Sequence, residues 1–102
     1  MIRVRIERDA TGRIRGFEAK GHAGAGPKGN DIVCAAVSVL TDSVFLGLDR
    51  HLKRAMEWSA NSGDISVRLK DAPDEMTEAI LATMVLGLTE IQKLYPDKLR
   101  IL

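Results

Sequence analysis

The segment from Ile32 to about Leu52 constrains the fold most, because its first half is apolar around nearly the whole circumference of a helix. Apolar residues recur along it at helical spacing, at Val33, Val37, Leu40, Val44 and Leu48. A helix that is apolar on most of its sides has to be buried on more than one of them. We therefore expect a sheet of the same chain to cover one side and a second copy of the chain to cover another.

Alternating residues predict the first two strands of that sheet. Ile2, Val4 and Ile6 alternate with charged residues over 2–8, which is the pattern of a half-buried strand. A turn at 9–12 leads into a second strand over 13–20, where Gly16 marks a change of phase. The two strands are predicted to form a hairpin with a bulge at Gly16.

The C-terminal half predicts a second hairpin, a second long helix and a final strand. Strands over 53–60 and 64–70 flank an Asn-Ser-Gly turn, and 98–102 alternates as a short strand does. The helix opens at 72–75, with proline near the first helical position and acids in the first turn, and it stops at 95–96. Its predicted inner stripe consists of Met76, Ile80, Met84, Gly87, Ile91 and Leu94.

These elements follow one another in the order β-β-α-β-β-α-β, which predicts an α+β fold with one largely antiparallel sheet packed against two long helices. A chain of 102 residues is long enough to bury one core and too short for two. We therefore expect a single domain over residues 1–102.

Charge and composition exclude several classes of partner. Lys and Arg number 15 against 14 Asp and Glu, a net charge of +1, so no direct binding of nucleic acid is predicted. No apolar stretch reaches the roughly 18 uncharged residues of a membrane span, and the N-terminus lacks the apolar core of a signal peptide. A single cysteine forms no internal disulfide, which fits a reducing compartment. We expect a cytoplasmic protein without a membrane partner.

His22 and Cys34 carry the chemistry that the sequence offers. A free thiol has a pKa near about 8.5 and is mostly protonated at neutral pH, so a nucleophilic cysteine needs surroundings that favour the thiolate. Asn30 or Asp31 is a good helix N-cap, which places Cys34 in the first turn, where free N–H groups favour an anion. The imidazole of His22 can take the thiol proton and deliver it to a leaving amine. Asp31 is expected to cap or orient this helix.

A glycine-rich loop joins the two residues. Gly21, Gly24, Gly26 and Gly29 reach positive φ without strain and expose backbone N–H groups. Such groups can receive an oxyanion or admit an extended substrate backbone.

Purely structural roles are also compatible with these residues. A lone cysteine in an apolar helix is usually a small buried hydrophobe. Ser38, one turn after Cys34, bonds either the site or a backbone carbonyl, and His51 is a solvated residue near a helix C-terminus. One Cys and two His lack the spacing of a zinc set, so neither a metal nor a cofactor is predicted.

The segment 21–38 resembles a motif of the ribosomal-processing cysteine proteases. The resemblance rests on Gly21-His22-Ala23, the glycines that follow, Gly29, and the run Asp31-Ile32-Val33-Cys34-Ala35-Ala36-Val37-Ser38. The motif covers under a fifth of the chain, while the length and the order of elements agree with the family across all 102 residues.

The resemblance implies a specific activity. Members of this family are cytoplasmic homodimers that remove a short N-terminal extension from large-subunit ribosomal protein twenty-seven. By resemblance, Cys34 is the nucleophile and His22 the general base and acid, while Gly21, Gly29, Asp31 and Ser38 match motif positions with supporting or substrate-binding roles. The implied partners are a peptide substrate and a second copy of the chain.

Two other functions are compatible with the same residues. In the first, the chain is a non-enzymatic ribosome-associated or peptide-binding module, and Cys34 is a packing residue. In the second, it is a small thiol transferase or redox sensor, which needs a resolving thiol from another molecule because Cys34 is the only cysteine.

Overall fold

The computed structural model describes residues 1–22 and 31–102, which form strands and helices in the predicted order. The elements are β1 (Ile2–Arg8), β2 (Ile14–Lys20), α1 (Ile32–Leu46), β3 (Met56–Asn61), β4 (Asp64–Leu69), α2 (Glu75–Leu94) and β5 (Leu99–Ile101). A π-helical turn, Gly47–His51, continues α1.

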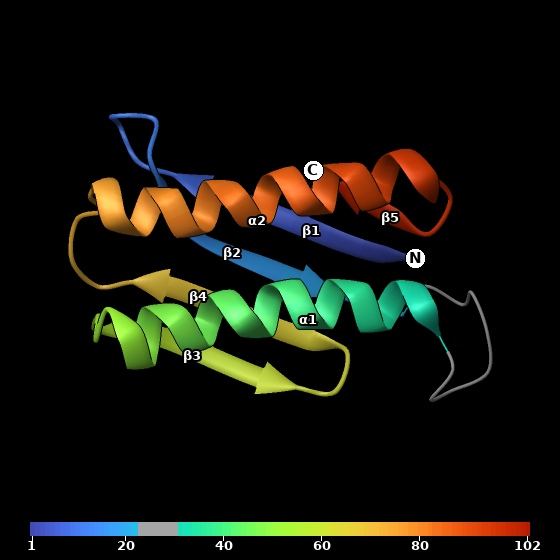
Figure 1. The fold of residues 1–102 in the computed structure, drawn as a ribbon, viewed down its shortest axis with the longest axis horizontal. Coiled ribbons are helices and arrows are strands. Elements are labelled where there is room, and N and C mark those ends of the chain that lie inside the picture. The colour runs from blue at the N-terminus through green and yellow to red at the C-terminus, as the bar shows by residue number, and fades with distance from the viewer. Residues whose placement is uncertain (23–30) are drawn as a thin grey trace.

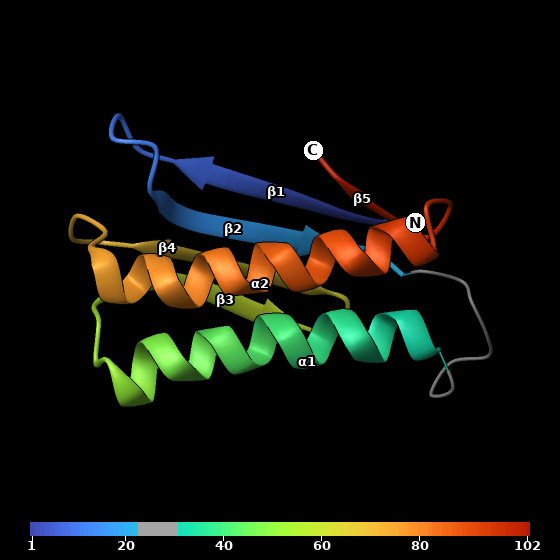
Figure 2. The same ribbon diagram turned by 45° about the horizontal axis from the view of Figure 1, so that its top comes forward.

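One sheet and one layer of helices make up the domain. The strand order is β3-β4-β2-β1-β5, in which β5 alone of the described strands runs parallel to its neighbour, β1. Both helices cover the same face of this sheet (Figures 1 and 2). The structure confirms the predicted α+β class and the largely antiparallel sheet.

Apolar side chains from alternate strand positions meet those of the helices in a single core. The fully buried members include Val4, Ile14, Leu48, Leu81 and Leu99. The opposite face of the sheet is charged and open, and its side chains form exposed ion pairs such as Lys20–Glu18 and Arg68–Glu7. The hydrophobic layer between the helices and the sheet therefore supplies the stability of the domain.

The predicted bulge in the first hairpin is present beside Gly16. Glu7 pairs with Gly16 and Arg8 pairs with Ile14, so Arg15 is the extra residue. A Cβ atom at position 16 would lie 2.4 Å from the carbonyl oxygen of Val67, so glycine allows β4 to approach β2 at this point.

The segment between α1 and β3 differs from the prediction. The helical residues continue through the π-helical turn to His51, and Lys53 then adopts a positive φ of 53°. The strand predicted from 53 therefore begins only at Met56, because the intervening residues complete the turn that reverses the chain.

The N-terminus of α2 is held by a reciprocal pair of hydrogen bonds. The Asp74 carboxylate accepts from the backbone of Met76 and Thr77, and the Thr77 hydroxyl accepts from the backbone of Asp74. Pro73 therefore precedes the cap instead of lying in the first turn, whereas Glu75 and Glu78 occupy the first turn as predicted. The Arg54 guanidinium, followed by the backbone bond from Thr77, lowers the pKa of the Asp74 carboxyl.

The predicted inner stripe of α2 is correct at Met84 and wrong at its two ends. The buried residues are Thr77, Leu81, Met84 and Leu88, whereas Met76 and Leu94 are exposed. The reason is that α2 packs on two partners at once. A Cβ atom at Gly47 would lie 3.7 Å from Ile80, and one at Gly87 would lie 3.0 Å from Leu40, so part of the predicted stripe faces α1 and its π-helical continuation.

One described helical stretch, Ile32–His51, is long and apolar enough to cross a membrane by length and composition. A helix that packs one face inside a protein core has the same composition, and Val33, Val37, Val44 and Leu48 are buried in this way. The absence of a membrane partner stays a prediction.

Two leucines of α2 test its corrected phase. Leu88→Ala removes a side chain that is 0% exposed and should lower the free energy of unfolding by about 2–5 kcal/mol. Leu94→Ala, at a position 75% exposed, should change it by less than about 0.5 kcal/mol. Chemical denaturation of both variants measures the difference. A larger loss for Leu94→Ala than for Leu88→Ala would show that the helix is turned as the sequence alone suggested.

Candidate functional site

Cys34 lies in the first turn of α1, as predicted. Asp31 is the N-cap, and its carboxylate accepts hydrogen bonds from the backbone N–H groups of Val33 and Cys34, each at 3.0 Å. The burial of Val33 and Val37 fixes the rotation of the helix, so the half-buried Cys34 points away from the core centre. The cap thus anchors the backbone of the residue that carries the thiol.

His22 lies just beyond the end of β2, and its backbone is held in place through Gly21, which precedes it, and Gly63, in the β3–β4 turn. Gly21 has a φ of 103°, and its N–H donates to the carbonyl oxygen of Gly63 at 2.9 Å. The terminal ammonium of Met1 donates to the carbonyl oxygen of His22 at 2.8 Å. The chain that carries the exposed imidazole is therefore tied to the β3–β4 turn and to the start of β1.

Gly63, in the β3–β4 turn, supports the imidazole itself. Its φ is 74°, and a Cβ atom there would lie 2.7 Å from Cε1 and Nε2 of His22. A methyl group at that distance would displace the ring. The imidazole therefore rests against a surface that only glycine leaves free.

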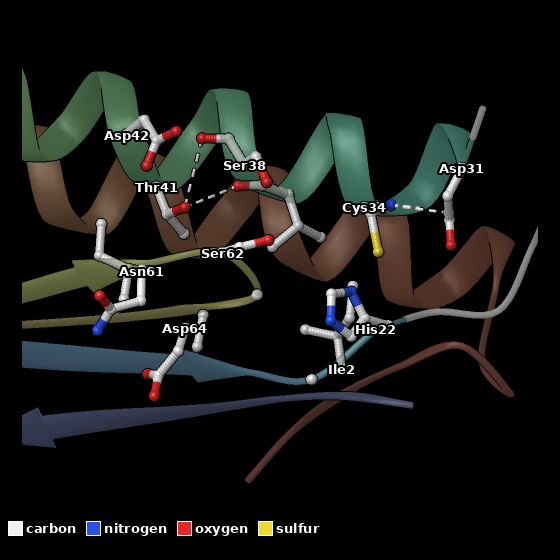
Figure 3. A pocket seen from close by; sticks show the side chains of 15 residues that line it. Ile2, His22, Asp31, Cys34, Ser38, Thr41, Asp42, Asn61, Ser62 and Asp64 are labelled. Carbon is white, nitrogen blue, oxygen red and sulfur yellow. Dashed lines mark hydrogen bonds between the residues drawn. The ribbon is translucent and has the colours of Figure 1, made fainter. Parts of the chain in front are cut away.

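His22 and Cys34 line one cavity of about 700 Å³, between α1 and the β3–β4 turn. Figure 3 shows the Cys34 thiol directed from α1 toward the His22 ring, which comes from the end of β2. Residues from both walls complete the lining, among them Ile2, Ala19, Val37, Ser38, Thr41, Asp42, Ser62 and Ile65. A thiol and an imidazole that face one open cavity are suited to nucleophilic attack on a bound carbonyl group.

The other predicted site residues have different positions. Asp31 and Gly21 border the cavity, and the exposed Ser38 lines it one turn after Cys34. Gly29 lies outside the described residues, as do the other loop glycines, Gly24 and Gly26. His51 is exposed at the far end of the π-helical turn and takes no part in the cavity.

Sequence reasoning missed the residues that the β3–β4 turn and the third turn of α1 contribute. Gly63 was identified only as part of a turn, and its contact with His22 joins segments that are far apart in sequence. Thr41 is buried, and its hydroxyl donates to the Val37 carbonyl oxygen at 2.9 Å, while Asp42 follows it on the cavity wall. The spacing of Cys34, Ser38 and Asp42 was the available signal, since residues four apart share a helix face.

A metal centre finds no support in the part of the chain that the structure describes. Within residues 1–22 and 31–102, no three His, Cys, Asp or Glu side chains group closely enough to hold a metal ion.

Comparison with known sequences identifies the protein family of this chain. The family model described as cysteine protease Prp matches residues 1–100. The ribosomal processing cysteine protease Prp of Staphylococcus aureus strain Mu50 is 33% identical over 104 residues, covering 99% of this chain and 97% of the relative. The protein of the same description from strain NCTC 8325 matches to the same extent.

Solved structures agree with the sequence matches. The S. aureus ribosomal processing protease Prp in complex with a covalently linked product peptide has a TM-score of 0.91 at 26% identity, covering 99% of this chain and 97% of that chain. The same protease in complex with a substrate peptide has a TM-score of 0.87 at 25% identity, covering 100% and 98%. SMU.848 from Streptococcus mutans has a TM-score of 0.79 at 27% identity, covering 99% and 91%.

The fold, the cavity and these matches together define a cysteine protease, a hydrolase. Within that class, the chain belongs to the Prp family of ribosomal processing cysteine proteases.

Gly63→Ala tests whether the β3–β4 turn positions the imidazole. The added methyl group displaces the His22 ring, so kcat/KM for a cleaved peptide should fall by about 10²-fold. Gly12→Ala is the matched control, because Gly12 has a similar φ of 88° and nothing within 4 Å of the added atom. Steady-state kinetics of both variants measure the difference in kcat/KM. A Gly63→Ala protein as active as Gly12→Ala would show that the turn does not position His22.

Proposed function

We propose that the protein is a cysteine endopeptidase in which Cys34 is the nucleophile and His22 is the general base and acid. The single observation that carries the proposal is that the thiol and the imidazole, from different elements, face one cavity (Figure 3). The family membership supports the reaction class, and the geometry supports the two residues.

The position of Cys34 favours its thiolate. The residue lies in the first turn of a helix of 15 residues, where the positive end of the helix dipole stabilises an anion. The carboxylate of Asp31 opposes this effect electrostatically while it holds the turn in place through its two hydrogen bonds. In this proposal, protonation of His22 compensates for the opposing charge, because the imidazolium attracts the thiolate.

The reaction then follows from the two groups. His22 accepts the thiol proton, and the sulfur of Cys34 attacks the scissile carbonyl carbon to form a tetrahedral oxyanion. Collapse of that intermediate breaks the C–N bond, and His22 delivers the proton to the leaving amine, which leaves a thioester on Cys34. His22 next takes a proton from water, whose hydroxide displaces the sulfur and releases the new carboxylate.

The substrate in this proposal is the N-terminal segment of large-subunit ribosomal protein twenty-seven, from which the enzyme removes a short extension. Two lines of support point to a peptide of this kind. The relatives are described as ribosomal processing proteases, and the S. aureus protease has been solved with a substrate peptide and with a covalently linked product peptide. The reducing cytoplasm, which keeps a single thiol reduced, is the proposed location.

Cleavage of that peptide by the protein and its variants tests the function. Incubation with the N-terminal segment of the host's own ribosomal protein twenty-seven should yield one cut, located by mass spectrometry. Cys34→Ser and His22→Ala should each lower kcat/KM by at least about 10³-fold, because each removes a member of one catalytic unit. A peptide that binds without being cut would instead favour the peptide-binding module with a structural cysteine.

The same proposal makes the protein a homodimer. Ile32, Val39 and Leu46 follow one another at intervals of seven residues on α1, so they form one stripe on the side away from the buried face. They are 61%, 65% and 39% exposed, respectively, which is high for large apolar side chains. A second copy that covers this stripe would bury the remaining apolar side of the helix.

Light scattering at micromolar concentration tests the dimer. The wild-type protein should show the mass of two chains, and Val39→Glu should show the mass of one, because a charge in the centre of the stripe opposes burial. Leu102→Glu, at a residue 58% exposed beyond β5, is the control and should stay dimeric. A wild-type mass of one chain contradicts the proposal.

A further inference from the structure

The face of α1 that carries Cys34 continues well beyond the catalytic cavity. Cys34, Ser38, Asp42 and Phe45 follow one another at helical spacing, and the first three line the cavity. Phe45 is the next residue on that face, and its half-buried ring packs against the hydrophobic core. This face of α1, here called the track, therefore runs from the cavity to an aromatic ring.

The strand β3 lies opposite the far end of the track. Its alternate residues Trp58 and Ala60 pair with the buried Val67 and Ile65, so they lie on the face of the sheet that the helices cover. The ring of Trp58 contacts that of Phe45, with their centroids 4.8 Å apart and the planes tilted by 52°. The two aromatic side chains therefore join α1 to β3 at the end of the track.

The fold buries only part of the Trp58 side chain. Its side chain is 56% exposed, although it faces the helices, and the fully buried core excludes it. A tryptophan that presents an open ring surface next to a catalytic cavity is typical of a binding surface.

We infer that Trp58 and Phe45 form a remote substrate subsite, the aromatic subsite, which binds an apolar side chain of the peptide about five residues from the scissile bond. The inference rests on the proposed function, because it places the scissile bond at Cys34. Its occupant is the peptide substrate itself, since Phe45 and Trp58 each lie three residues along α1 and β3 from a residue that lines the cavity, Asp42 and Asn61 respectively.

The distance follows from elementary geometry. Phe45 is eleven residues after Cys34 on a helix, and a rise of about 1.5 Å per residue separates them by about 16 Å along the axis. An extended peptide advances about 3.3 Å per residue, so it covers that distance in about five residues.

The sheet edge favours the extended conformation that this distance requires. Among the described strands, β3 pairs with β4 alone and forms one edge of the sheet, which leaves every second backbone N–H and C=O of β3 facing outward. A peptide that leaves the cavity at Asn61, the end of β3 that lines it, and extends along this strand would reach the level of Trp58.

Trp58 fluorescence tests the inference directly, because the chain has no other tryptophan. Cys34→Ala protein is titrated with the N-terminal peptide of ribosomal protein twenty-seven, extended about eight residues on each side of the mapped bond. The emission should shift to the blue as the ring is covered. A peptide shortened to about three residues on each side should bind without the shift, and shortening one end at a time identifies the side that reaches the ring.

Kinetics of Trp58→Ala provide the second readout. The variant should lose about tenfold in kcat/KM, mainly through KM, on the long peptide and nothing on the short one. Trp58→Phe should restore most of the loss, and Leu102→Ala, with a similarly exposed side chain on the other edge of the sheet, should lose nothing.

The outcomes separate the two proposals. Long peptide that is cut normally by Trp58→Ala, or that binds without a shift in emission, contradicts the aromatic subsite and leaves the protease assignment intact. Peptide that wild-type protein neither cuts nor binds contradicts both.

Discussion

Burial of one face of α1 is the constraint on which the rest of the structure depends. Val33, Val37, Val44 and Leu48 fit against the sheet and α2, and this fixes both the rotation and the height of the helix. Cys34 follows directly after the first of these buried residues, so the packing of the core determines where the thiol points. A small domain has little apolar surface to spare, and the same buried layer that stabilises the fold also aims the nucleophile.

The histidine is held by different means. The backbone around the exposed His22 is tied at two points: the N–H of Gly21 donates to the carbonyl oxygen of Gly63, and the Met1 ammonium donates to the carbonyl oxygen of His22. The imidazole then rests on the bare backbone of Gly63. Hydrophobic packing thus fixes the Cys34 thiol, and hydrogen bonds at a turn fix the His22 imidazole. The two groups lie on opposite walls of the cavity, and a peptide can enter between these walls.

The sequence predicted those features that depend on local periodicity. The strands followed from alternating residues, and a cap at Asn30 or Asp31 followed from their side chains. The glycine loop allowed His22 to approach Cys34 without requiring it. The inner stripe of α2 was predicted only in part, because the helix packs on both α1 and the sheet, and a single apolar stripe does not say which partner each residue faces. The role of Gly63 and the aromatic contact of Phe45 with Trp58 were beyond prediction, since each joins residues that only the three-dimensional fold brings together.

The most direct test of the account is the rate at which iodoacetamide alkylates Cys34 as a function of pH, in wild-type and His22→Ala protein. The chain has one cysteine, so the signal belongs to one thiol. The account predicts fast alkylation in wild-type protein well below the pKa of about 8.5 of a free thiol, and a shift of the profile to higher pH in His22→Ala. Profiles that coincide with each other and with that of a free thiol would contradict the activation of Cys34 by His22.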